Sequence, residues 1–280
     1  MYIELIECTK CGHKARPGEL GFQLAYLQDR NTHQITCKCG NVFEVITSRD
    51  QLILSNNIFV RLEEASNHIE RGIIKLTPGT VEEVRFERQF DFACRAFLCS
   101  QNVPIYIREL SLNKDKLVIL SSYPKDKKSV PGDATITWSV FGLVNIDILP
   151  PWYVHFYGAI SQLVNGLYNV ALIDYAVAFE IFMENFLVRK LEDRFGVDAT
   201  EYILKKAWRI EDRCKDLLFL ATGHKLSERD DVYQAWNSFV KKPRNDLAHG
   251  KSLKVDNQAA EDAHQATYQA IRWVENVAGQ

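Results

Sequence analysis

The sequence predicts a multidomain α+β protein with a small cysteine-containing module, a β-rich domain and a helical domain. Two tight cysteine pairs occur near the N-terminus, apolar residues then alternate with period two, and helical periodicity begins after Pro150 and Pro151. A length of 280 residues suits two or three domains, each with enough apolar content for a core. We expect these domains at residues 1–49, 50–150 and 151–280.

In the first domain each cysteine pair is followed by a glycine that allows a tight turn of the backbone. This pattern is typical of a zinc ribbon, in which four thiolates complete a structural site and leave no open position for catalysis. A module of this size has too small a core to fold without metal or neighbouring domains. His13 and His33 are alternative ligands, because the second pair has one intervening residue where two are commoner. The expected zinc ligands are Cys8, Cys11, Cys37 and Cys39.

Period-two alternation in the second domain is clearest between Val84 and Leu98, and it predicts a sheet with one apolar face. Further strands are expected at 73–76, 105–108, 117–120 and 134–144, separated by turns rich in Gly, Pro, Asn and Asp. A short helix is expected at about 61–71. This β-rich domain has no recognisable catalytic residues, and a recognition or sensing role is the default hypothesis.

The third domain is expected to form helices at about 168–191, 200–221, 227–241 and 256–277. Ser227 and Asp230 have the spacing of a capping box at the start of the third. The first helix carries two apolar stripes and therefore needs two packing partners, which we interpret as the bundle core and a second subunit. One stripe consists of Val170, Ile173, Val177 and Ile181, and the other of Leu172, Tyr175, Phe179, Phe182 and Phe186.

Several polar and aromatic side chains of this domain are expected to have structural roles. Glu180 and Glu184, one turn apart, are expected to be held by Arg or Lys rather than to act directly in catalysis. Core or interface positions are expected for Tyr175, Trp208 and Trp236. Surface positions are expected for His224 and His264.

The segment from Lys241 to Gly250 places an arginine, an adjacent amide and a histidine within about one and a half helical turns. A histidine side chain can move a proton at neutral pH, and an arginine stays charged and can neutralise charge on a phosphate. Pro243 is expected to break the helix before this motif. The net charge of −2 gives no global argument for nucleic acid, but Lys241, Lys242 and Lys251 make the motif locally basic and are candidate phosphate contacts.

With these features the chain resembles the HEPN superfamily, whose signature is an Arg, a polar residue and a His four to six positions after the Arg. Arg244, Asn245 and His249 match that signature, and the helix from Tyr175 to Leu187 is similar to the family's first core helix. The resemblance covers about residues 152–278. It implies an all-α helical bundle that forms a homodimer, with catalytic residues Arg244, His249 and Asn245 at a composite site.

The activity that the resemblance implies is metal-independent endoribonuclease cleavage. The ribose 2′-hydroxyl attacks the adjacent phosphorus and leaves a 2′,3′-cyclic phosphate. Many members of the family are host-defence, antiviral or toxin-type effectors, so an antitoxin or regulator is an expected partner besides RNA. One variant of the family carries a modifiable tyrosine two positions after the histidine, where this chain has Lys251.

The same sequence features are compatible with two other functions. The first is a non-catalytic dimeric module that binds RNA or protein, and the second is a zinc-ribbon regulator that binds duplex DNA. The acidic N-terminus does not resemble a signal peptide and no long apolar run is present, so we expect a cytoplasmic protein that does not enter a membrane. The odd number of cysteines, seven, fits a reducing compartment.

Overall fold

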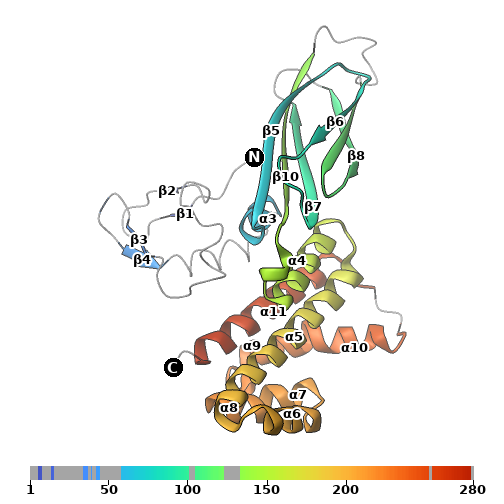
Figure 1. Cartoon of the computed structure of the whole chain (residues 1–280). Coiled ribbons are helices and arrows are strands. Elements are labelled where there is room, and N and C mark those ends of the chain that lie inside the picture. The colour runs from blue at the N-terminus through green and yellow to red at the C-terminus, as the bar shows by residue number, and fades with distance from the viewer. Residues whose placement is uncertain are drawn as a thin grey trace. The chain divides into compact units, whose positions relative to one another are not determined.

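The computed structural model describes residues 58–100, 105–122, 133–251 and 254–278, together with Cys39 and four short strands in the first 44 residues. The chain divides into two compact units, residues 1–148 and 149–280 (Figure 1). The first contains antiparallel β-sheets and the second consists of helices. This confirms the α+β class with sheets in the middle region and helices at the C-terminal end. The zinc ribbon and the superfamily of the helical part stay predictions.

The short N-terminal strands form two antiparallel pairs. Strand β1 (Ile6–Glu7) pairs with β2 (Lys14–Ala15), and β3 (Gln34–Thr36) pairs with β4 (Val42–Glu44).

Two three-stranded antiparallel sheets form the larger part of the first unit, together with the short helix α3 (Ile58–Ala65). One sheet has the order β5-β10-β7, with β5 at His68–Leu76, β10 at Ala134–Leu143 and β7 at Phe92–Ser100. The other has the order β6-β9-β8, with β6 at Val81–Arg85, β9 at Lys116–Ser122 and β8 at Tyr106–Leu112 (Figure 1). Side chains from both sheets share one apolar core, which includes Leu76, Phe90, Leu117, Ile119, Ile136, Trp138 and Val140.

Gly72 fixes the packing of the central strand β10. In the register of β5 against β10 it lies opposite Trp138, and a Cβ atom at this position would lie 2.7 Å from Cζ2 of the indole. Any side chain larger than hydrogen would therefore displace the ring. This contact explains why a glycine occupies the middle of a long strand.

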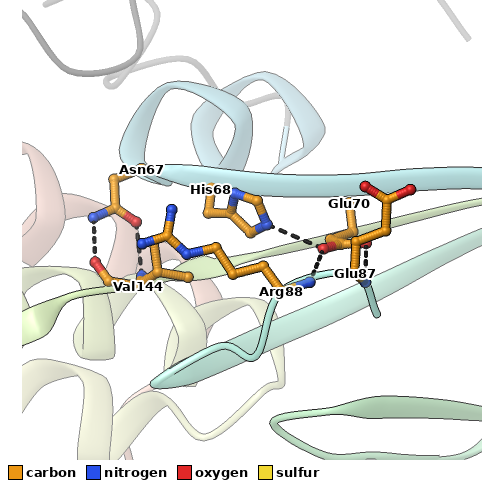
Figure 2. A network of polar contacts seen from close by, with 6 residues as sticks. All are labelled: Asn67, His68, Glu70, Glu87, Arg88 and Val144. Atoms are coloured by element: carbon orange, nitrogen blue, oxygen red, sulfur yellow. Dashed lines mark hydrogen bonds and ion pairs between the residues drawn. The ribbon is translucent and has the colours of Figure 1, made fainter. Parts of the chain in front are cut away.

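Two boundaries predicted in this unit were wrong. The alternating segment between Val84 and Leu98 is not one strand, because a turn at 86–91 separates β6 from β7 and the two strands belong to different sheets. The helix expected at 61–71 ends at Ala65, and β5 begins at His68. Asn67 marks this change of structure, since its side-chain amide exchanges two hydrogen bonds of 2.8 Å with the backbone of Val144 (Figure 2).

Glu70 holds the turn between β6 and β7 against strand β5. Its buried carboxylate accepts hydrogen bonds from the backbone N–H groups of Glu87 (3.1 Å) and Arg88 (2.8 Å), and it lies 3.2 Å from Nε2 of His68 (Figure 2). A carboxylate that satisfies two backbone donors compensates for its own burial. The chain reverses direction at this turn, so β6 and β7 are two separate strands although the alternation of apolar and polar residues runs through both.

Glu70→Ala is therefore expected to lower the free energy of unfolding of the β-sheet unit by about 2–4 kcal/mol, because two backbone donors lose their acceptor. Native-state hydrogen exchange, which separates the two units, should show the loss at the amides of Glu87 and Arg88. Glu82→Ala is the matched control, an exposed acid on β6, and should cost about 0.5 kcal/mol or less. Equal effects of the two substitutions would contradict the role given to Glu70.

The second unit begins with two long antiparallel-packed helices, α4 (Pro151–Val164) and α5 (Tyr168–Phe195), preceded by the short 3-10 helix η2 (Ile146–Ile148) of the first unit. Among the described residues, eight shorter elements and the long helix α11 follow (Figure 1). They are α6 (Val197–Lys206), α7 (Ile210–Asp212), η3 (Arg213–Leu217), α8 (Leu218–Thr222), η4 (Leu226–Glu228), α9 (Asp230–Trp236), η5 (Asn237–Lys241), α10 (Lys242–Ala248) and α11 (Asn257–Ala278).

Two expected helices have different boundaries in the structure. The helix expected at 200–221 is interrupted after Lys206, and Trp208 lies in the interruption. The capping box was wrong, because Ser227 lies inside η4 and α9 follows Arg229 without a side-chain cap. The last helix begins as expected, where Oδ1 of Asp256 accepts a hydrogen bond of 2.9 Å from the N–H of Ala259.

The core of the helical unit forms around one stripe of α5. All five aromatic or leucine side chains expected on this stripe are buried: Leu172, Tyr175, Phe179, Phe182 and Phe186. Trp236 is buried against Phe179, with ring centroids 4.9 Å apart. His264 was expected at the surface but is fully buried, with its ring 5.3 Å from those of both Phe156 and Tyr175. Within the described residues, no helix combines the length and apolar character needed to cross a membrane.

Candidate functional site

The arginine–histidine motif lies at the end of one continuous helical segment made of α9, η5 and α10. Pro243 does not break this segment, contrary to the expectation, and it occupies the first turn of α10. The turn before it, η5, is a π-helix. A proline lacks the N–H donor and its ring crowds the carbonyl of the preceding turn, so a wider π turn accommodates it without ending the helix.

The C-terminal end of α10 has the hydrogen bonds of a Schellman motif. The N–H of Gly250, which has φ +69°, donates to the carbonyl of Leu247 (3.0 Å), and the N–H of Lys251 donates to that of Asp246 (2.9 Å). His249 is the last residue before this reversal, and its N–H donates to the carbonyl of Asn245 (3.0 Å). The backbone at His249 is therefore fixed while its side chain is exposed.

The guanidinium of Arg244 is held by two neighbours. Its Nη1 donates to Oδ1 of Asn245 (3.2 Å), and its Nη2 lies 3.4 Å from Oε1 of Glu180 on α5. About a third of the arginine side chain stays exposed (35%). Within the described residues these two acceptors leave other donors of the guanidinium available to a ligand. Asn245 thus has a positioning role toward Arg244, because its side-chain oxygen accepts a hydrogen bond from the guanidinium.

Both glutamates of α5 are paired with arginines, as expected for acids held by Arg or Lys, although Glu184 is exposed and not partly buried. Glu184 lies 3.1 Å from Nη1 of Arg213, whose Nε also donates to the carbonyl of Ala207. Sequence periodicity places Glu180 and Glu184 on one face, but it could not tell which arginine each acid meets, because those arginines lie 29 to 64 positions further along the chain.

His249 forms no hydrogen bond or ion pair through its ring within the part of the chain that the structure describes. The nearby Asp246 carboxylate is held by Lys251, with Nζ to Oδ1 at 2.6 Å. This hydrogen bond lowers the pKa of Asp246, and the positive charges of Lys251, Lys242 and His249 lower it further. Asp246 therefore stays ionised and paired with lysine at neutral pH, and the imidazole is available to an outside group.

The three candidate phosphate-binding lysines differ in their surroundings. Lys241 is paired with Glu211, and although partial burial acts to raise the pKa of that carboxyl, the hydrogen bond from Lys241 lowers it overall. Lys251 is paired with Asp246. Lys242 is exposed and has no ion pair among the described residues. The structure therefore favours Lys242 over the other two as a cation available to phosphate.

Arg244 and His249 do not lie on one face of the helix. Five residues of α-helix rotate the chain by about 140° beyond a full turn and advance it by about 7.5 Å. One phosphate could contact Arg244 and His249 of the same chain only if it lay at the C-terminal end of α10, where it could reach both sides of the helix. A guanidinium from one copy and an imidazole from another could meet it directly if two copies placed these helix ends together.

The apolar stripe of α5 that consists of Val170, Ile173, Val177 and Ile181 is exposed at its N-terminal end, whereas Val177 and Ile181 are partly buried. Val170 and Ile173 are 44% and 40% exposed, and Leu167 just before the helix is 51% exposed. Val177 and Glu180 follow Ile173 at helical spacing on the same side of α5, and Glu180 is the partner of Arg244. We define the three exposed residues Leu167, Val170 and Ile173, together with the partly buried Val177, as the exposed stripe, which thus leads toward the motif.

No family model, curated protein or solved structure matches this chain significantly. Its function is therefore inferred from the chemistry of its own residues and from the sequence resemblance.

Of the predicted zinc ligands, Cys8, Cys11 and Cys37 lie outside the described residues, whereas Cys39 is described and exposed. The strand pair β1–β2 flanks the first cysteine pair in sequence, and β3–β4 flanks the second. Within the described residues alone, no group of three or more His, Cys, Asp or Glu side chains could hold a metal ion.

Proposed function

We propose that this protein is a metal-independent endoribonuclease that cuts RNA at a site built from Arg244, Asn245 and His249. The observation that carries the proposal is the state of these groups at the end of α10. The guanidinium is fixed by Asn245 and Glu180, and the exposed imidazole has no hydrogen-bonding partner within the described residues. Phosphodiester cleavage requires an oriented cation and an available acid–base group, and both are present at the end of α10.

The proposed reaction is attack of the ribose 2′-hydroxyl on the adjacent phosphorus. His249 moves a proton to or from the reacting oxygens, and Arg244 neutralises the charge that develops on the phosphorane oxygens. The bond to the 5′-oxygen breaks, so the products are a 2′,3′-cyclic phosphate and a 5′-hydroxyl. Asn245 and Glu180 act as positioning residues for Arg244, and Lys242 contacts a flanking phosphate.

A second copy of the chain would complete the site. Helix geometry separates Arg244 and His249 of one chain by about 140° around α10, and the exposed stripe of α5 provides an apolar face next to Glu180. Packing of two such faces around a two-fold axis close to Glu180 would bring the two motifs together. The resemblance to the HEPN superfamily supports the same arrangement, as well as a role as a defence or toxin-type effector under the control of a regulator.

The route through the 2′-hydroxyl can be tested on the substrate. A labelled RNA that is cleaved at a mapped position should resist cleavage when a single 2′-deoxynucleotide replaces the ribonucleotide before that bond. The same substitution two nucleotides away is the control and should leave cleavage unchanged. Cleavage of the deoxy-substituted bond at the original rate would exclude this mechanism.

The second candidate function is a non-catalytic dimeric module that binds RNA or protein. The observation that favours it is that Arg244 already has a carboxylate partner in Glu180, as a structural arginine would. The two functions differ in one result, since a binding module would retain RNA or partner affinity and show no cleavage under any activating condition.

We also propose that the N-terminal cysteines hold one structural zinc ion, on the basis of their spacing and of the strand pairs β1–β2 and β3–β4 that flank them. Elemental analysis of the purified chain should give about one zinc per chain for four-thiolate ligation. Cys8→Ser combined with Cys37→Ser should abolish zinc binding, whereas Cys99→Ser, an exposed cysteine of β7, should not. A metal-free wild-type protein that keeps the strand pairs β1–β2 and β3–β4 would contradict the assignment.

A further inference from the structure

Four exposed aromatic rings in the second unit each have a cation above or beside them. Phe195 has Arg194 at 5.2 Å from the ring centroid, Tyr202 has Lys206 at 5.4 Å, Trp208 has Arg209 at 5.2 Å, and Phe219 has Lys225 at 5.1 Å. We define these eight residues as the aromatic–basic surface.

These rings are more exposed than aromatic side chains usually are. Trp208 is 72% exposed, Tyr202 63%, Phe219 51% and Phe195 40%. Exposed apolar side chains that gather in one region, unlike ones scattered singly, generally mark a binding surface. Trp208 was expected to be a core or interface residue, and its exposure rules out the core.

Two hydrogen bonds link the segments that carry the rings. Nη1 of Arg194 donates to the carbonyl of Leu220 (2.6 Å), next to Phe219, and Nε of Arg213 donates to the carbonyl of Ala207 (3.1 Å), next to Trp208. Helices α6, α7 and α8 gather at the end of the helical unit that lies lowest in Figure 1. The aromatic–basic surface therefore belongs to one end of this unit.

The cations of this surface are not neutralised by carboxylates. None of Arg194, Lys206, Arg209 and Lys225 forms an ion pair within the described part of the chain. The acids Glu201 and Glu211 are instead paired with Lys205 and Lys241, although Arg209 is near enough to Glu211 to help lower the pKa of that carboxyl. Asp198, Asp212 and Asp216 are the acids of the segment that remain without an ion pair there.

We propose that the aromatic–basic surface binds single-stranded RNA, with Trp208 and Tyr202 as the main stacking rings. Bases of a single strand stack on aromatic faces, and the phosphates between them pair with the adjacent lysines and arginines. A duplex hides its base faces and cannot stack in this way. A protein partner is less well matched, because the rings alternate with charged groups and do not form one apolar centre. The inference rests on the proposed function for the identity of the strand as RNA.

The test measures binding separately from cleavage. Full-length protein carrying His249→Ala is titrated against a labelled single-stranded RNA of about 12 nucleotides, a length typical of such sites, and against the same RNA as a duplex. Trp208→Ala and Tyr202→Ala should each weaken single-strand binding by about tenfold, as expected for the loss of one stacked base. Tyr106→Ala, which removes a ring that is 60% exposed and belongs to the other unit, should change affinity by less than about twofold.

Tryptophan fluorescence gives a direct readout of stacking. Trp138 and Trp236 are buried and Trp208 is the most exposed tryptophan within the described residues, so quenching by RNA should be lost in Trp208→Phe while most of the affinity remains. Three results would each overturn the inference: unchanged affinity in Trp208→Ala and Tyr202→Ala, equal affinity for the duplex, or no binding of RNA. The last of these would favour a protein partner for this surface. Binding through Trp208 without any cleavage by the wild type would refute the proposed enzyme and support the surface.

Discussion

Replacement of His249 by alanine is expected to lower the rate of RNA cleavage by about a hundredfold or more, the usual loss when an acid–base group is removed. Arg244→Ala should have a similar effect, because charge on the phosphorane is no longer neutralised. Both effects should appear in the cleavage rate at saturating RNA. Single-turnover cleavage of a labelled RNA measures them directly.

Neither substitution should unfold the protein. The ring of His249 is exposed and has no hydrogen bond or ion pair within the described residues. The pair between Arg244 and Glu180 is about one third exposed on each side, so its loss should cost at most about 1 kcal/mol. Matched controls are His224→Ala, which removes a part-exposed histidine paired with Glu228, and Arg229→Ala, which removes an exposed arginine paired with Asp231. Full activity in His249→Ala would eliminate the proposed site.

Mixing the two inactive variants is expected to restore activity. If each active site combines Arg244 of one copy with His249 of the other, a heterodimer of Arg244→Ala and His249→Ala has one intact site and one site without either group. Random exchange of equal amounts gives heterodimers as about half of the dimers, so about a quarter of the wild-type activity should return. The expected rise over either variant alone is therefore more than tenfold.

The complementation experiment has an internal control. Mixing wild type with the double variant Arg244→Ala, His249→Ala produces heterodimers in which each site lacks one group, so activity should fall below that of the wild type mixed with buffer. If both groups acted within one chain, the inactive variants would not complement each other. The wild type would also keep its full activity in the presence of the double variant.

Periodicity predicted the helices best where one face is buried. The stripe of α5 with Tyr175, Phe179 and Phe182 was expected in the core and is buried there. The same argument applied to α11 would have placed His264 correctly, since it lies at helical spacing between the buried Ala260 and Thr267. His264 was expected at the surface, but its ring packs against those of Phe156 and Tyr175.

The errors occurred where contacts between distant segments decide the structure. A period of two describes both β6 and β7, but nothing local in the sequence shows that Glu70 binds the backbone of Glu87 and Arg88 and holds the turn between them. In the same way, Pro243 predicts a break, whereas the π turn of η5 lets the helix continue. The motif itself was visible as a pattern, but the partners of Arg244 depend on the packing of α10 against α5.

The most direct test of the central claim is incubation of the purified protein with a mixed pool of tRNA and mRNA in excess EDTA, beside His249→Ala, with the ends of the products mapped. Cleavage by the wild type alone, leaving 2′,3′-cyclic phosphates and 5′-hydroxyls, is the predicted result. Equal cleavage by His249→Ala, or wild-type products with 3′-hydroxyl and 5′-phosphate ends, would contradict a metal-independent ribonuclease that acts through Arg244 and His249.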